Sequence, residues 1–216
     1  MNISSVRIIG FFCTLLACKL MIYYLNQSLI TEGMHYAELI EKFDHEQALK
    51  MLERRRLPGI ILLEYGVLTL GLVFKLVLIS SAMMAGFFSV NLSCPKRIIL
   101  QSVIIVEFVH LVPAFLSFLW FTFGAETYDM QSLNDFPTFS IADLFNVNSK
   151  DAYYPLYRSL RYFNLTEIGF CAVLSYCFSL ALDISIYKSA KIVFIAYFLG
   201  LLIMALLRAF ITASIL

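Results

Sequence analysis

Five long apolar stretches divide this chain, and they constrain its fold more than any other feature of the sequence. A helix needs about 20 mainly apolar residues to cross the hydrocarbon core of a bilayer. The stretches that fit such a span are 6–25, 60–88, 98–123, 165–182 and 190–216. They are too long and continuous for the alternating strands of a membrane barrel. The sequence therefore predicts one all-α membrane domain, 1–216, with about five transmembrane helices.

The composition agrees with burial in lipid. Of the 216 residues, 61% are hydrophobic and 14% are charged, whereas a soluble domain has roughly a quarter charged residues and about half apolar ones. A chain of this size cannot hide such an excess of apolar side chains from water, so we expect the excess to face the lipid bilayer. The net charge is +1. Because no basic stripe is interleaved with aromatic residues, nucleic acid is not an expected partner.

The first apolar stretch has two interpretations. Arg7 precedes it, and the sequence Leu-Leu-Ala-Cys at 15–18 resembles a bacterial lipoprotein cleavage box. However, apolar residues continue past Cys18 to Leu25, and no flexible polar tether follows. We therefore favour an uncleaved span over a signal peptide.

A polar segment, 26–59, follows the first span. Within it, 33–56 carries apolar residues at helical spacing and charged residues on the other face, which predicts an amphipathic helix. This helix ends in Arg54, Arg55 and Arg56, and the Pro-Gly pair that follows is a stop signal. Such a helix could lie at the membrane interface or bind a partner. A solvated connector packed on its own bundle explains the pattern equally well.

The loop 124–164 is the second informative polar region. Its aromatic residues are mixed with arginines, which is typical of the headgroup layer of a membrane. We expect short amphipathic helices at 140–146 and 155–162 that lie on the membrane surface or dip into it. The residues of this loop that we expect to face lipid or a partner are Phe139, Phe145, Tyr154, Arg158, Arg161 and Phe163.

The orientation is weakly indicated by charge. Five spans put the two termini on opposite faces of the membrane. Lysine and arginine number five on the N-terminal face and eight on the other face. The positive-inside rule therefore favours a cytoplasmic C-terminal face, by a small margin.

Ionisable residues inside the spans are the first candidates for function, because burying them in lipid is costly. Glu64 and Lys75 share one face of the second span but lie roughly 16 Å apart, too far to pair directly. Each therefore needs a partner on another helix, or water. Glu167 and Asp183 are expected at the two ends of the fourth span, where water is available.

Glu107 and His110 are three residues apart in the third span and share a helical face. Pro113 follows, and it should weaken the helix locally and free a carbonyl group. A carboxylate, an imidazole and a weakened helix could form a proton relay. The alternative, which we favour, is a structural network in which Glu107 meets Lys75 or Lys19 across the bundle.

Signatures of enzymes and metal sites are missing from the sequence. It contains no phosphate-binding loop, no H-E-x-x-H helix and no G-x-S-x-G turn. The other histidines, His35 and His45, lie in the polar segment away from His110, so no metal site is expected. The cysteines form no C-x-x-C pair and are expected to pack as small apolar residues. We predict a protein that is not an enzyme and has no cofactor.

Four short motifs resemble the Yip1-domain family of membrane proteins. They are Phe-Ser-Ile-Ala-Asp-Leu-Phe at 139–145, Tyr-Pro-Leu-Tyr-Arg-Ser-Leu at 154–160, Phe-Asn-Leu-Thr-Glu-Ile at 163–168 and the polar hairpin at 183–191. The resemblance implies five spans, in agreement with the apolar stretches. It also implies a cytoplasmic N-terminus, opposite to the charge count. Eukaryotic members are trafficking factors that bind small GTPases, but this chain lacks their long hydrophilic N-terminal region and their Asp-Leu-Tyr-Gly-Pro motif.

Two functions follow as the main hypotheses. The first is a non-enzymatic scaffold or an assembly or trafficking subunit, which binds lipid or a partner protein through the two polar regions. The second is a transporter or permease-type subunit that uses Glu64, Lys75, Glu107 and His110, and it requires a water-accessible cavity joining them. A more distant third is an intramembrane enzyme acting on lipid, with His110 as general base. The composition favours a bacterial inner (cytoplasmic) membrane.

Overall fold

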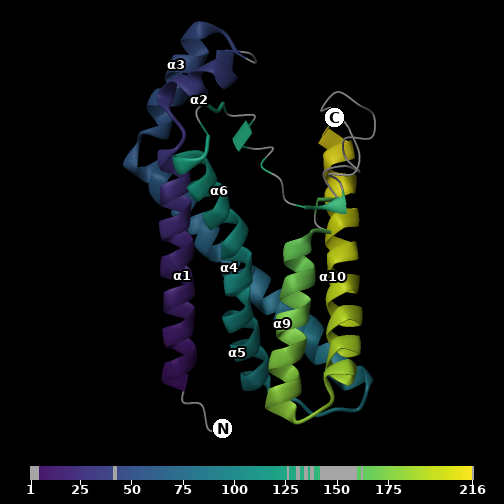
Figure 1. Ribbon diagram of the computed structural model, residues 1–216. Helices are drawn as coiled ribbons and strands as arrows, with labels where there is room; N and C mark the ends of the chain where they lie inside the picture. The colour runs from purple at the N-terminus through teal and green to yellow at the C-terminus, as the bar shows by residue number, and fades with distance from the viewer. Residues whose placement is uncertain are drawn as a thin grey trace. The chain divides into compact units, whose positions relative to one another are not determined.

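The fold is described from a computed structural model, for residues 5–40, 43–125, 127–129, 132–133, 136, 139–141, 160–161 and 163–215. In chain order the helices are α1 (Ser5–Ser28), α2 (Glu32–Ile40), α3 (His45–Arg55), α4 (Pro58–Ser89), α5 (Lys96–Val106), the short 3-10 helix η1 (Glu107–His110), α6 (Leu111–Phe123), α9 (Leu165–Leu182) and α10 (Ile186–Ile215) (Figure 1). Five helical stretches among these residues are long and apolar enough to cross a membrane. The predicted all-α membrane fold is confirmed.

The observed spans agree closely with the apolar stretches, and local sequence explains where they end. The stretch at 165–182 coincides with α9. The side chain of Asn164 caps this helix, because its oxygen accepts a hydrogen bond from the backbone N–H of Glu167 at 3.0 Å. Asp183 ends α9 in the left-handed conformation, with a φ of 52°. Pro58 opens α4, where its missing N–H has no intrahelical partner to lose.

The polar segment after the first span differs from the prediction. We expected one helix over 33–56, and the structure has two, α2 and α3. Asp44 has extended backbone angles (φ −63°, ψ 153°) immediately before α3 begins. Aspartate is a favoured residue at the N-cap position, although the Asp44 side chain makes no capping hydrogen bond here. The apolar period continues through this point, and for this reason the sequence pattern looked unbroken.

The third span is interrupted where the sequence led us to expect weakness. The 3-10 helix η1 separates α5 from α6. Pro113 has no N–H to donate to the carbonyl of Val109, four residues earlier, and its ring crowds that carbonyl. The backbone tightens just before the proline as a result. Glu107 and His110 are the first and last residues of η1.

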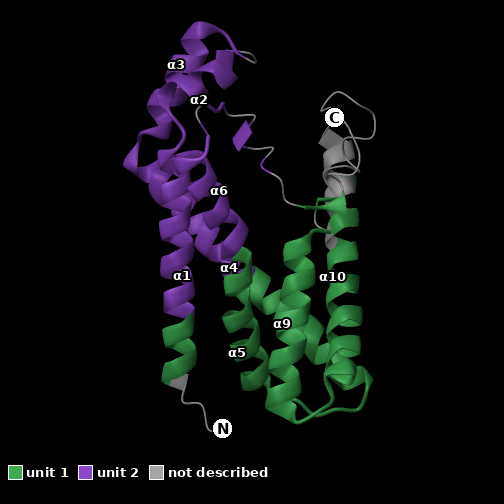
Figure 2. Cartoon of the chain, viewed as in Figure 1, with its two compact units in different colours: residues 1–11, 75–110, 137–216 green, residues 12–74, 111–136 purple. Residues whose placement is uncertain are grey.

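The chain divides into two compact units (Figure 2), and each is described by itself. Unit 1 comprises 1–11, 75–110 and 137–216, and its buried core residues come from α4, α5, α9 and α10. The rings of Phe87 and Phe178 pack edge to face, with their centroids 4.9 Å apart. Gly86 lets α4 approach α10 closely, because a Cβ atom there would lie 2.8 Å from that of Ala196. The hydroxyl of Ser189 donates to the carbonyl of Ser175 at 2.7 Å and joins α10 to α9.

Unit 2 comprises 12–74 and 111–136. The amide Nδ2 of Asn26, on α1, donates to the carbonyl of Ala114, on α6, at 3.1 Å. The hydroxyl of Tyr128 donates to the carbonyl of Leu29 at 3.1 Å, and its ring packs against Phe121 with centroids 5.2 Å apart. These contacts join α6 and the residues that follow it to the end of α1.

Little of the loop 124–164 falls within the described residues. Ser140 pairs with Asn164 in an isolated antiparallel bridge, which brings this part of the loop against the start of α9. The helices expected at 140–146 and 155–162 lie, apart from residues 140–141 and 160–161, outside the described part of the chain. Three of the predicted surface residues also lie outside it, namely Phe145, Tyr154 and Arg158.

Candidate functional site

The site begins with an ion pair between two spans of unit 1. The Nζ atom of Lys75, in the middle of α4, lies 2.8 Å from Oε1 of Glu107 in η1 and donates a hydrogen bond to it. The side chain of Glu107 is only 3% exposed, and that of Lys75 is 35% exposed. Of the two partners predicted for Glu107, Lys75 and Lys19, the structure shows the ion pair with Lys75.

His110 stands between two carboxylates. Its Nδ1 atom lies 3.1 Å from Oε2 of Glu107, and its Nε2 atom lies 3.1 Å from Oε2 of Glu167 in the first turn of α9. The contact with Glu107 is close but poorly aligned for a hydrogen bond, since neither atom has a hydrogen-bond partner in the described structure. An imidazolium presents an N–H group to each carboxylate, whereas neutral imidazole has only one N–H to offer.

Tyr197 completes the arrangement from α10. Its hydroxyl donates to Oε2 of Glu167 at 2.5 Å. The ring of Phe170 lies between His110 and Tyr197, with centroids 4.7 Å from the first and 5.0 Å from the second. We call the resulting series Lys75, Glu107, His110, Glu167 and Tyr197 the polar chain. It joins α4, η1, α9 and α10.

The polar chain can be electrically balanced. Its two carboxylates face one ammonium group and one imidazole, so the set carries no net charge when the imidazole is protonated. Charges removed from water are tolerated only when they are paired and hydrogen-bonded. Each member therefore compensates its neighbours, and loss of one leaves another buried without a partner.

Glu64 does not join this chain. It belongs to unit 2, where Tyr23 donates to its Oε2 atom at 3.2 Å and the Nε atom of Arg55 lies 3.9 Å from Oε1. Of the four intramembrane residues singled out in the sequence, three are in contact and the fourth has separate partners. Glu64 and Lys75 do not pair with each other, as their separation along the helix predicted; each has other partners.

The structure adds two residues that the sequence analysis missed or misplaced. Glu167 was expected at a water-exposed helix end, and this was wrong, because its side chain is mostly buried between His110 and Tyr197. The pair Asn164 and Glu167 carries an N-cap spacing that correctly locates the start of α9. That signal does not reveal that the carboxylate turns inward. Tyr197 gave no signal, since a tyrosine among apolar residues is usual in a span.

The three consecutive arginines have different surroundings. Arg54 is exposed, and Arg56 forms an ion pair with Glu32 at the start of α2. Arg55 is half-buried, and its Nη1 atom donates to Nδ1 of His35 at 3.0 Å. Burial, followed by the positive charge of Arg55, lowers the pKa of His35 below its ordinary value.

A hollow of about 210 Å³ lies between α2 and α3. Four apolar side chains and three polar or charged ones line it: Leu39, Phe43, Met51, Leu52, His35, Glu38 and Arg55. Phe43 and Met51 are about 40% exposed. We call this feature the α2–α3 hollow.

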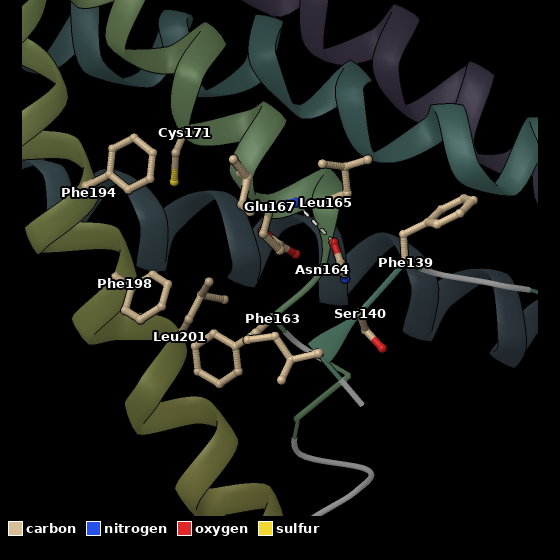
Figure 3. Close-up of a pocket in the computed structure, with 12 residues that line it drawn as sticks. Phe139, Ser140, Phe163, Asn164, Leu165, Glu167, Cys171, Phe194, Phe198 and Leu201 are labelled. Carbon is tan, nitrogen blue, oxygen red and sulfur yellow. Dashed lines mark hydrogen bonds between the residues drawn. The ribbon is translucent and has the colours of Figure 1, made fainter. Parts of the chain in front are cut away.

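A larger cavity of about 540 Å³ lies in unit 1, and we call it the α9–α10 pocket. Residues 139–141, the beginning of α9 and the middle of α10 line it (Figure 3). Phe163, one of the predicted surface residues, packs on Phe198 at 5.1 Å in its wall. Phe139 is largely exposed at its edge and has a positive φ of 50°. Arg161 is half-buried.

Among the described residues, no group of three His, Cys, Asp or Glu side chains could hold a metal ion. Comparison of the chain with protein-family models, with curated proteins and with solved structures found no match. The class of protein therefore follows from the fold and the buried site alone. The chain is a polytopic α-helical membrane protein with a polar chain in its membrane domain.

Proposed function

We propose that this protein is a non-enzymatic membrane scaffold, an assembly or trafficking subunit that holds a partner protein at the α2–α3 hollow. The hollow is the observation that carries the proposal. At 9 and 11 residues, α2 and α3 are too short to cross a membrane, yet Phe43 and Met51 expose apolar surface between them. Apolar side chains beside charged ones are the usual composition of a protein-binding surface.

The polar chain supports the same function, because it connects helices to one another. Its ion pair and hydrogen bonds are made between helices of one unit, and its member Glu107 is almost fully buried. A scaffold needs rigid helices to present a binding surface, and the ion pair and hydrogen bonds of the polar chain connect four helical elements of unit 1. The resemblance to the Yip1-domain family is consistent with this function, and a bacterial inner membrane is the proposed location.

Site-specific photo-cross-linking in cells tests the scaffold. We would place a photoreactive amino acid at Met51 and, as a matched control, at Lys50. Lys50 is on the same helix but does not line the hollow; it pairs with Glu46 at 2.6 Å. We expect one discrete protein adduct from position 51, little from position 50, and loss of the adduct in the Phe43→Glu variant.

Two results together would overturn the scaffold. One is the absence of a protein adduct at position 51. The other is a purified protein that is monomeric and moves a solute across liposomes. An adduct with lipid alone would contradict the protein partner, and would assign the two helices to the membrane surface instead.

Transport is the second candidate, and a specific observation favours it. Lys75, Glu107 and His110 are in contact, and Glu167 and Tyr197 extend them into a continuous series across four helices. An imidazole between two carboxylates is an arrangement that can pass a proton. Reconstituted protein should then carry a proton current that His110→Gln abolishes. Equal proton leak with native protein, with His110→Gln and with empty liposomes would exclude this candidate.

A further inference from the structure

We infer that the α9–α10 pocket binds a neutral, single-chain lipid with a hydroxyl group, and that this hydroxyl donates a hydrogen bond to Oε1 of Glu167. The inference does not depend on the scaffold function, since the pocket and the α2–α3 hollow belong to different units. It rests on the lining of the pocket, on the free side of the Glu167 carboxylate, and on the charge balance of the polar chain.

The lining is that of a site for a hydrocarbon chain. Its walls are predominantly apolar, and they include the rings of Phe163, Phe194 and Phe198. The volume of about 540 Å³ lies within the range of roughly 300–1,000 Å³ that is usual for small-molecule sites. Two helices long and apolar enough to cross a membrane form the site, so the lipid phase is the natural source of its ligand.

The polar specificity comes from one oxygen atom. His110 and Tyr197 both bind Oε2 of Glu167, and within the described chain Oε1 receives no hydrogen bond. Glu167 is also part of the pocket lining. Figure 3 shows its carboxylate among the apolar side chains. A hydroxyl group in the pocket would give Oε1 a charge-assisted hydrogen bond, which is stronger than one between neutral groups.

The charge balance selects a neutral donor. With His110 protonated, the polar chain has no net charge, so an ammonium group would add an uncompensated positive charge to an apolar site. An anionic head group would meet the carboxylate of Glu167 directly. A hydroxyl group supplies the missing hydrogen bond without either cost.

The position in the span suits such a molecule. Glu167 is in the first turn of α9, about 3 Å along the helix axis from its first residue, which is near the end of the hydrocarbon layer. Cys171, deeper on α9, lines the same pocket about 9 Å from the level of Leu165. A lipid hydroxyl at the edge of the hydrocarbon would therefore meet Glu167, and its chain would run toward Cys171 and Phe194.

The test uses the full-length protein in nanodiscs and a hexadecanol probe that carries a diazirine in its chain and an alkyne at its end. Labelling is measured alone and in competition with hexadecanol, its methyl ether, hexadecylamine and hexadecanoate. Leu201→Trp fills the pocket and leaves every residue of the polar chain unchanged in sequence. Leu202→Trp is the matched control, because Leu202 is the next residue of α10 and is exposed away from the lining.

Glu167→Gln replaces the hydrogen-bond acceptor that faces the pocket with a donor. Tyr197 and His110 would hold the amide oxygen in the place of Oε2, and the amide NH2 would face the pocket and donate. The native site should prefer hexadecanol to its methyl ether about tenfold or more, because only the alcohol can donate to a charged acceptor. In Glu167→Gln this preference should disappear, because the ether oxygen can accept. A purely structural role of Glu167 predicts no such change.

The expected result is labelling that Leu201→Trp reduces about tenfold and Leu202→Trp leaves unchanged, with the alcohol as the best competitor. The inference is overturned if Leu201→Trp labels like the native protein, or if alcohol and ether compete equally in the native site. Preference for the amine or for the carboxylate would also overturn it.

Discussion

The Nζ atom of Lys75, on α4, lies 2.8 Å from Oε1 of Glu107, in η1. In the sequence, a loop and the whole of α5 separate these two elements. Glu107 also approaches His110, so the same carboxylate serves a partner on another helix and one on its own. The pair explains how a lysine in the middle of one span and a glutamate in the middle of another can be tolerated in lipid. It also allows the change in stability on substitution of either residue to be predicted.

Lys75→Met should destabilise the protein. It leaves the buried carboxylate of Glu107 with His110 as its remaining partner, and we expect a loss of about 1–3 kcal/mol, below the range for a fully buried pair because the Lys75 side chain is 35% exposed. Chemical denaturation in detergent micelles, followed by helical circular dichroism, measures the change. The double variant Lys75→Met/Glu107→Gln should recover much of the loss, because no unpaired charge is left. Equal stability of Lys75→Met and native protein would show that the pair contributes nothing.

Tyr197→Phe should cost about 1.5–3 kcal/mol, the range for a hydrogen bond to a charged group. The substitution removes the hydroxyl that donates to Glu167 and keeps the ring that packs on Phe170. Tyr176→Phe is the matched control on α9, since Tyr176 is exposed and surface changes usually stay within about 0.5 kcal/mol. The same denaturation experiment compares them, and equal effects would refute the assigned role of the Tyr197 hydroxyl.

Much of the fold was predictable, because spans are encoded locally. Twenty or so apolar residues make a transmembrane helix whatever the rest of the chain does, and the apolar stretch 165–182 coincides with α9. The division of the amphipathic segment into α2 and α3 was missed, because a helical period does not show whether Asp44 continues a helix or caps the next one.

The candidate site was predictable only in part, because partners on different helices depend on how the helices pack. Glu107 and His110 share a face of one helix, so their proximity could be read from spacing. The pairing of Glu107 with Lys75 was one of two alternatives. The burial of Glu167 and its contact with Tyr197 depend on how α9 and α10 pack against η1. The residue spacing within either helix does not predict this packing.

Gly86→Ala should destabilise unit 1 by about 1–3 kcal/mol, the usual cost of overpacking. The added Cβ would lie 2.8 Å from the Cβ of Ala196 and 3.3 Å from a methyl group of Ile192, so α4 and α10 would have to separate. Gly71→Ala, on the same helix, has open space around it and should be neutral or stabilising by up to about 1 kcal/mol through helix propensity. Thermal unfolding in detergent distinguishes the two, and a stabilising Gly86→Ala would contradict the close helix contact.

Acid should loosen the α2–α3 pair through His35. Burial and Arg55 lower the pKa of His35 below 6.5 in the folded protein, so the unfolded state binds the proton more readily. The stability of the pair is therefore fully present above about pH 6.5 and is lost as the pH falls through the lower folded-state value. Protonation also removes the acceptor at Nδ1 that receives the hydrogen bond from Arg55.

Hydrogen exchange of the α2 and α3 backbone, corrected for intrinsic exchange rates, measures this loss at pH 7.5 and pH 5.5 (about one unit on either side of the ordinary histidine pKa). Protection should fall at the lower pH in the native protein. In His35→Gln it should change much less, because the amide oxygen of glutamine can accept from Arg55 at both pH values. His45, which contacts Tyr36, is still present in that variant. An equal loss of protection with and without His35 would therefore assign the effect to His45 or to the carboxylates.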